Sequence, residues 1–75
     1  MSKKDYIKLA TAFGATLRHF DGNESLRGSA LMIIEDFTRV AKSDNPAFDS
    51  YRFMEWINEV SDGRRDMEGK KVKSA

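Results

Sequence analysis

The sequence predicts an all-α fold: a small three-helix bundle followed by a disordered basic C-terminal tail. Apolar residues recur at steps of three and four through three segments, which is the pattern of amphipathic helices. Capping residues, glycines and the single proline separate these segments. With 75 residues, the chain has the length of one domain. We therefore expect a helical domain over residues 1–63 and a disordered tail over residues 64–75.

The first predicted helix runs from about Lys3 to Phe20. Ser2 is a suitable N-cap, and Asp5 follows it three residues later, as in a capping box. Asp21 and Gly22 end the helix, because glycine readily adopts the left-handed conformation of a C-terminal cap. The apolar stripe consists of Tyr6, Leu9, Ala10, Phe13, Leu17 and Phe20.

The second predicted helix runs from about Glu24 to Lys42, with Asn23 as its N-cap. Gly28 weakens the first turns, so a start near Ser29 is the alternative. The stripe expected to face the core consists of Leu26, Ala30, Ile33, Phe37, Val40 and Ala41, widened by Ile34.

The third predicted helix runs from about Ser50 to Val60, after a break that contains Pro46. Proline disfavours the helical conformation in the residue before it, so we expect Asn45 to lie outside the second helix. Asp49 is the expected N-cap. The apolar face consists of Phe53, Trp56, Ile57 and Val60.

The three stripes are expected to meet in one hydrophobic core, to which the break adds a phenylalanine. Short amphipathic helices bury their apolar faces by packing against one another. The predicted core consists of Leu9, Phe13, Leu17, Phe20, Ile33, Ile34, Phe37, Val40, Phe48, Phe53 and Ile57.

The net charge of +1 hides a difference between the two parts of the chain. Residues 1–63 hold eight Lys/Arg and ten Asp/Glu, which leaves −2, whereas residues 64–75 hold five Lys/Arg and two Asp/Glu, which leaves +3. A basic tail attracts phosphate groups, but the predicted helices offer no basic face to accompany it. The candidate nucleic-acid-binding residues are Arg64, Arg65, Lys70, Lys71 and Lys73.

The sequence offers no set of residues for catalysis or metal binding. It contains no cysteine, which excludes disulfides and thiolate ligands, and His19 is the one histidine. A zinc site needs three or four ligands, and a histidine base needs an orienting partner and a substrate pocket. We interpret His19 as a residue that suits the C-terminal end of the first helix. We expect no catalytic residue, no metal, no cofactor and no enzymatic activity.

Membrane association is not expected either. No stretch approaches the roughly 20 apolar residues of a membrane-spanning helix. The basic start of the chain is followed by an amphipathic pattern instead of the apolar run of a signal peptide. We therefore expect a cytoplasmic protein.

Three large side chains on the third helix are candidates for contact with a partner protein: Tyr51, Met54 and Trp56. Aromatic residues and methionine are enriched at protein interfaces. The alternative is that Trp56 completes the core, with Arg52 stacked on it one turn away.

One stretch of the sequence, Asp44-Asn45-Pro46-Ala47-Phe48-Asp49-Ser50-Tyr51-Arg52-Phe53, carries a resemblance. It is similar to an Asp-Asn-Pro-x-Phe-Asp-x-x-Arg-Phe signature of short uncharacterised proteins carried by phages, prophages and plasmids. Lys4-Asp5-Tyr6 and Leu9-Ala10 resemble the start of those proteins, so the resemblance covers residues 3–17 and 34–57. It implies a mobile-element origin and no catalytic residues or cofactors. This chain differs by continuing through Glu55-Trp56-Ile57 and a basic tail.

These observations lead to three expected functions. The first is a small phage-type accessory protein in the host cytoplasm that binds a macromolecular partner, a host or defence protein. The second is a regulator that binds nucleic acid through its basic tail. The third is a homodimer in which the partner surface is a second copy of the chain.

Overall fold

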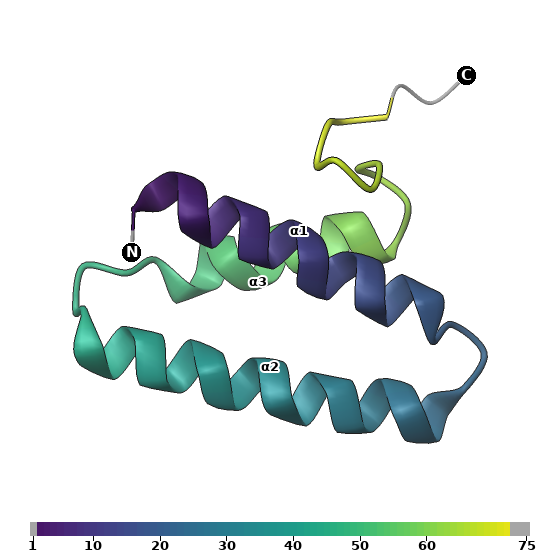
Figure 1. Cartoon of the computed structure of the whole chain (residues 1–75), viewed down its shortest axis with the longest axis horizontal. Helices are drawn as coiled ribbons and strands as arrows, with labels where there is room; N and C mark the ends of the chain where they lie inside the picture. The colour runs from purple at the N-terminus through teal and green to yellow at the C-terminus, as the bar shows by residue number, and fades with distance from the viewer. Residues whose placement is uncertain (1, 73–75) are drawn as a thin grey trace.

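The computed structural model describes residues 2–72 and contains three helices. They are α1 (Lys3–His19), α2 (Glu24–Asp44) and α3 (Ser50–Ser61). Figure 1 shows that α2 runs antiparallel to α1 and that α3 passes behind α1. No β-strand occurs within residues 2–72, where the one strand-like feature is an isolated bridge between Arg65 and Lys71. The predicted all-α three-helix bundle is confirmed.

The helices begin at the predicted caps. Ser2 and Asp5 form a capping box, in which the Asp5 N–H donates to Ser2 Oγ over 3.3 Å and the Ser2 N–H donates to Asp5 Oδ2 over 3.0 Å. Asn23 Oδ1 accepts from the Leu26 N–H at the start of α2. Because this cap lies at Asn23, α2 begins before Gly28, and the alternative start near Ser29 is wrong.

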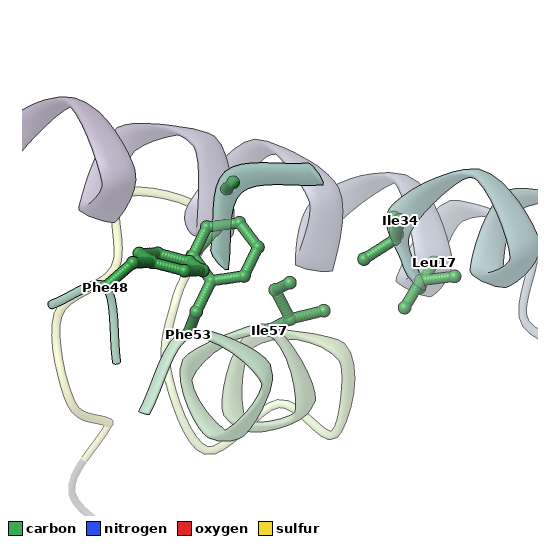
Figure 2. Packing of buried hydrophobic residues seen from close by; sticks show 7 residues of the cluster. Leu17, Ile34, Phe48, Phe53 and Ile57 are labelled. Atoms are coloured by element: carbon green, nitrogen blue, oxygen red, sulfur yellow. The ribbon is translucent and has the colours of Figure 1, made fainter. Parts of the chain in front are cut away.

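The closest helix packing joins α1 to α3. A Cβ atom at Gly14 would lie 2.8 Å from the Ile57 carbonyl oxygen, so only glycine allows this approach of the two backbones. Leu17, Ile57 and Val60 are fully buried around this contact. Figure 2 shows Leu17 and Ile57 in the space between the helices.

Aromatic rings fill the other end of the core. Phe48, from the break between α2 and α3, has its ring centroid 4.4 Å from that of Tyr6 and 5.3 Å from that of Phe53. Phe37 and Phe13 join the cluster with their centroids 5.5 Å apart. Phe48 therefore closes the bundle, and Figure 2 shows it beside Phe53.

Most of the predicted core is inside, but α2 is rotated relative to the prediction. Leu17, Ile34, Phe48, Phe53 and Ile57 are buried, Leu9, Phe13 and Phe37 pack against them, and Phe20 is half-buried. Ile33 and Val40 are 67% and 62% exposed, so their placement in the core is wrong. The face that α2 buries contains Ile34, Thr38 and Ala41 instead. Thr38 is compatible with burial because its hydroxyl donates to the Ile34 carbonyl oxygen over 2.7 Å.

The segment after α3 corrects the prediction of a disordered tail. Residues 64–72 fold back as a short hairpin, here called the C-terminal hairpin, in which the Val72 N–H donates to the Arg64 carbonyl oxygen over 3.0 Å. Asp66 Oδ1 accepts from the N–H groups of Glu68 and Lys70 and shapes the turn. Figure 1 shows the hairpin on the side of α1 and α3 that faces away from α2. The last residues of the predicted tail, 73–75, lie outside the described residues.

Candidate partner-binding surfaces

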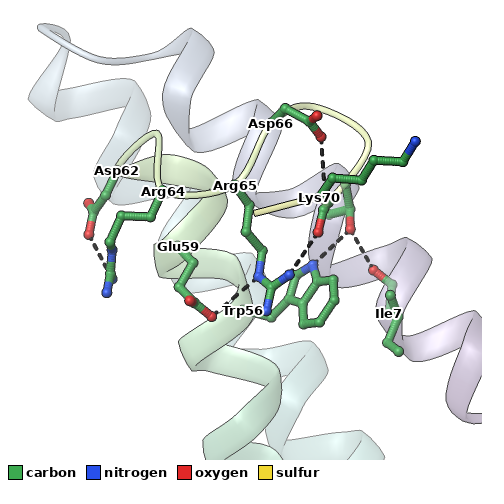
Figure 3. Close-up of polar contacts among 10 residues, drawn as sticks. Ile7, Trp56, Glu59, Asp62, Arg64, Arg65, Asp66 and Lys70 are labelled. Carbon is green, nitrogen blue, oxygen red and sulfur yellow. Dashed lines mark hydrogen bonds and ion pairs between the residues drawn. The ribbon is translucent and has the colours of Figure 1, made fainter. Parts of the chain in front are cut away.

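Trp56 is covered by the C-terminal hairpin and does not share a surface with Tyr51 and Met54. Its indole Nε1 donates to Thr11 Oγ1 over 2.9 Å, and the Thr11 hydroxyl donates to the Ile7 carbonyl oxygen over 2.8 Å. Figure 3 shows this chain of hydrogen bonds from α3 to α1. The polar end of the indole is therefore bonded within the protein.

Arg65 lies flat on the indole and is held there by two polar contacts. Its guanidinium carbon is 3.5 Å from the centroid of the Trp56 ring. Its Nε lies 3.4 Å from Glu59 Oε1, and its Nη1 donates to the Gly69 carbonyl oxygen over 2.8 Å (Figure 3). The side chains of Arg65 and Glu59 are 13% and 15% exposed. Arg65, and not Arg52, stacks on Trp56, and its charge is satisfied inside the protein.

Gly69 fits the hairpin onto the helices. Its φ angle of 87° lies in the left-handed region that favours glycine. A Cβ atom there would lie 2.8 Å from Thr11 Oγ1 and 3.2 Å from the Trp56 ring. Both the backbone conformation and the close contact therefore require glycine, a signal that the sequence alone did not reveal.

The other cations of the hairpin differ in their surroundings. Arg64 Nη2 lies 3.1 Å from Asp62 Oδ2, and Lys70 Nζ lies 3.9 Å from Glu68 Oε2. Lys71 is exposed and forms no ion pair within residues 2–72. Lys73 lies outside the described residues. Within residues 2–72, Arg64, Arg65 and Lys70 are thus each paired with a carboxylate, and Lys71 is not.

Met54 lines an open groove between α2 and α3, and Tyr51 lies three residues away on α3. Tyr51 is 76% exposed, whereas Met54 is half-buried with its sulfur 3.7 Å from Thr38 Oγ1. The groove has a volume of about 520 Å³. We call it the α2–α3 groove; it is lined by Glu35, Thr38, Arg39, Lys42, Ser43, Ser50 and Met54.

Two cations stand on the α2 wall of this groove. Arg39 Nη2 lies 3.0 Å from Asp36 Oδ1, and both side chains are largely exposed. Lys42 Nζ donates to the carbonyl oxygens of Pro46 and Phe48 over 2.7 and 3.0 Å. These bonds tie the end of α2 to the following loop, so Lys42 is both a wall residue and a support of the groove.

A second apolar surface lies on α2, where the sequence predicted core. Leu26, Ile33 and Val40 are 49%, 67% and 62% exposed and are spaced by seven residues. We call these three residues the α2 stripe. Met32 is 68% exposed on the same helix, but it lies about 100° around the axis from Ile33. The apolar spacing predicts burial for this stripe, because a line of exposed apolar residues lies next to a line of buried apolar residues on this helix.

Residues 2–72 contain neither a cluster of metal ligands nor a membrane-spanning helix. No three His, Cys, Asp or Glu side chains come together there in a way that would hold a metal ion. His19 lies in the last turn of α1, with its ring centroid 5.5 Å from that of Phe20. No helix in this part of the chain is both long and apolar enough to cross a membrane.

Comparison with known proteins gives no relative from which a role could be transferred. No family model matches the chain, and neither the curated proteins nor the solved structures contain a significant match.

Proposed function

We propose that this protein is a small phage-type accessory protein that binds another protein through the α2–α3 groove and the adjacent Tyr51. The observation that carries the proposal is an exposed tyrosine beside an open groove with methionine in its lining. The resemblance of residues 44–53 to the phage and plasmid signature supports a host or defence protein as the partner.

The residue types at the groove suit protein recognition. Tyrosine, methionine and arginine are all enriched at interfaces, and Tyr51, Met54 and Arg39 supply one of each. Tyrosine offers a large contact area at a low cost in side-chain entropy. Methionine adapts its shape to the partner surface.

Contacts within the protein also fix the shape of the groove in the absence of a partner. Thr38 Oγ1 contacts the Met54 sulfur, and Lys42 fixes the loop that follows α2. A preformed surface avoids the cost of ordering side chains and loops on binding. Because Glu35, Arg39 and Lys42 line the α2 wall, the partner segment that fits best presents an apolar side chain to Met54 and charges that complement this mixed wall.

The lining favours binding over catalysis. Ser43 and Ser50 are in the lining, but no histidine lies among the lining residues to activate a hydroxyl.

The test is affinity capture from lysate of the cells in which the protein occurs, followed by mass spectrometry. Tyr51→Ala and Met54→Ala are expected to reduce capture of the partner at least tenfold, since interface anchors can each contribute 2 kcal/mol or more. Met67→Ala is the matched control, because Met67 is 51% exposed but lies on the C-terminal hairpin. A partner that is retained by the Tyr51 and Met54 variants but lost with Met67→Ala would contradict the proposed surface.

A second candidate function is nucleic-acid binding by the C-terminal hairpin. Lys70 and Lys71 are exposed on this hairpin, which packs on Thr11 of α1. Lys4 and Lys8 precede Thr11 by seven and three residues and therefore share its side of α1. This placement supports a basic surface composed of the hairpin and α1, which the sequence alone did not suggest.

A gel shift with mixed DNA and RNA at about 0.15 M salt separates the two candidates. The groove proposal predicts no tight complex under these conditions. Retardation that falls steeply with salt and is lost in Lys70→Glu/Lys71→Glu would favour the second candidate. Arg39→Glu is the control, because Arg39 is exposed on α2, away from the hairpin.

A further inference from the structure

The α2 stripe is an apolar line that the bundle does not use. Leu26, Ile33 and Val40 lie two helical turns apart from one another, so the line is about 21 Å long at 1.5 Å per residue. All three are branched aliphatic residues, and about half or more of each is exposed. Single exposed apolar residues are ordinary, but these three recur every seven residues, which is the spacing of one of the two apolar positions in a coiled-coil repeat.

We propose that the α2 stripe pairs with the α2 stripe of a second copy of this chain, in an antiparallel and symmetric homodimer. The two-fold axis passes beside Ile33, so that Ile33 faces Ile33 of the second copy and Leu26 faces Val40. A symmetric pair requires the same surface on both copies. The stripe meets this requirement because Leu26 and Val40 are equidistant from Ile33 and both are aliphatic.

The residues that border the stripe favour a second copy in this orientation. In the antiparallel arrangement Ala30 lies beside Phe37 of the second copy on one side of the stripe, and Ser29 lies beside Asp36 on the other side, so a small side chain lies opposite each larger one. A parallel arrangement would instead place Asp36 opposite Asp36, and like charges repel. Antiparallel helices also align their dipoles favourably. The border carries one charge per copy, so it offers little to a strongly charged partner.

The weak hold of the bundle on α2 gives the pairing a structural role. Beside the partly buried Leu31 and Phe37, which pack against the core, α2 buries only Ile34, Thr38 and Ala41, and only the first of these three is a large aliphatic. Chains of this size without disulfides often gain stability from oligomerisation. The stripe is narrow compared with the roughly 800 Å² per partner of a standard interface. We therefore expect a weak dimer that forms at about 0.5 mM and dissociates near 1 μM.

Sedimentation over this concentration range tests the pairing. The mass is expected to rise from the monomer value of 8.6 kDa towards twice that value. Ile33→Asp and Ile33→Lys should each remain monomeric, because each places two like charges at the two-fold axis, and mixing the two variants should restore association. Met32→Asp should associate like the unchanged chain. A monomer at 0.5 mM, or an Ile33→Asp dimer, would overturn the proposal.

Disulfide trapping tests the orientation and does not depend on charged variants that could unfold. The chain has no cysteine of its own. Under mild oxidation Ile33→Cys should cross-link to itself, because residues on the two-fold axis come within disulfide reach. Leu26→Cys alone should not cross-link, but its mixture with Val40→Cys should. Self-linking of Leu26→Cys would contradict the antiparallel arrangement, and failure of Ile33→Cys would contradict the dimer.

The dimer and the proposed partner site can fail independently. Lys42 lies in the groove wall and is nine residues from Ile33, which places it about 180° around α2 from the stripe. Capture of a partner by the Ile33→Asp monomer would support the groove while the dimer is absent. Loss of capture with Tyr51→Ala, in a variant that still dimerises, would show that the two surfaces are separate.

Discussion

Trp56 Nε1 donates a hydrogen bond of 2.9 Å to Thr11 Oγ1 and so joins α3 to α1 across 45 residues of sequence. The Thr11 hydroxyl in turn donates a hydrogen bond to the Ile7 carbonyl oxygen of the preceding turn. Because the hydroxyl accepts from the indole while donating to the backbone, both polar groups are satisfied where the hairpin covers them. The pair provides the surface on which Arg65 and Gly69 rest.

Thr11→Val is expected to destabilise the fold by about 1–3 kcal/mol, because it keeps the side-chain shape and leaves the Trp56 N–H without its partner. The measurement is urea unfolding followed by circular dichroism. Thr16→Val is the matched control, since Thr16 also bonds to a carbonyl one turn earlier but is exposed. A loss of similar size in both variants would show that the hydroxyl serves only its own helix.

Gly69→Ala is expected to detach the C-terminal hairpin from the helices. The new Cβ meets Thr11 and the Trp56 ring, and a positive φ costs a non-glycine residue about 1–3 kcal/mol. Trp56 is the single tryptophan, so its emission should shift to longer wavelength as the ring is uncovered.

Gly22→Ala separates backbone strain from the contact at Gly69. Gly22 has the same φ of 87° but nothing within 4 Å of its Cβ position. It should lower stability through strain while leaving the Trp56 emission unchanged. Unchanged emission in Gly69→Ala as well would contradict the packing of the hairpin on Trp56.

Acid is expected to loosen the hairpin turn. Hydrogen bonds from the N–H groups of Lys70 and Glu68 lower the pKa of the Asp66 carboxyl from its ordinary value of 3.8. A carboxyl with a lowered folded-state pKa contributes stability that is complete above the unfolded value and is lost as the pH falls through the folded value. Trp56 emission should therefore stay constant from pH 7 to about pH 4 and change below that.

Asp66→Asn identifies the group responsible for this acid response. The amide oxygen still accepts hydrogen bonds from the turn but does not titrate. The step in Trp56 emission below pH 4 should therefore shrink in this variant. Asp62→Asn is the control, because Asp62 pairs with Arg64 at the exposed surface. If only Asp62→Asn reduced the step, the acid response would belong to Asp62 and not to Asp66.

The helices and their starts were predictable because their signals are local. Ser2, Asn23 and Asp49 each cap the helix that follows, and each is visible as a polar residue before an apolar repeat. The burial of Phe48 was also predictable, because a single large aromatic side chain between a proline and an N-cap residue is expected to pack in the core.

The hairpin was not predictable because its stability comes from contacts distant in sequence. Composition argued for disorder, as residues 64–72 contain two large apolar residues, Met67 and Val72, and both are exposed. What orders the segment is the stacking of Arg65 on Trp56, the ion pair with Glu59 and a glycine contact to Thr11. None of these pairings leaves a periodic pattern in the sequence.

The rotation of α2 has a different cause. Ile33 and Ile34 are neighbours on adjacent lines of the helix, and apolar spacing alone ranks both as core residues. The choice between them depends on which line contains the residues that fit against α1 and α3. Thr38 and Ala41 are small enough for that line, but a polar threonine is a weak signal for burial.

The two neighbouring isoleucines provide the sharpest test of this register, because the substitutions are chemically identical. Ile34 is 2% exposed and Ile33 is 67% exposed. Ile34→Ala should cost about 2–5 kcal/mol, the range for truncating a buried aliphatic side chain. Ile33→Ala should change stability by less than about 0.5 kcal/mol, because it removes little buried surface and alanine favours the helix.

Thermal and urea unfolding at about 1 μM, where the proposed dimer is dissociated, compare the two variants as monomers. At that concentration Ile34→Ala should unfold well below the unchanged chain, and Ile33→Ala should overlay it. At about 0.5 mM the Ile33→Ala curve should fall below that of the unchanged chain, because only the unchanged chain gains stability from association. Equal losses for both isoleucines at 1 μM would mean that α2 buries the line predicted from the sequence and not the line that contains Ile34, Thr38 and Ala41.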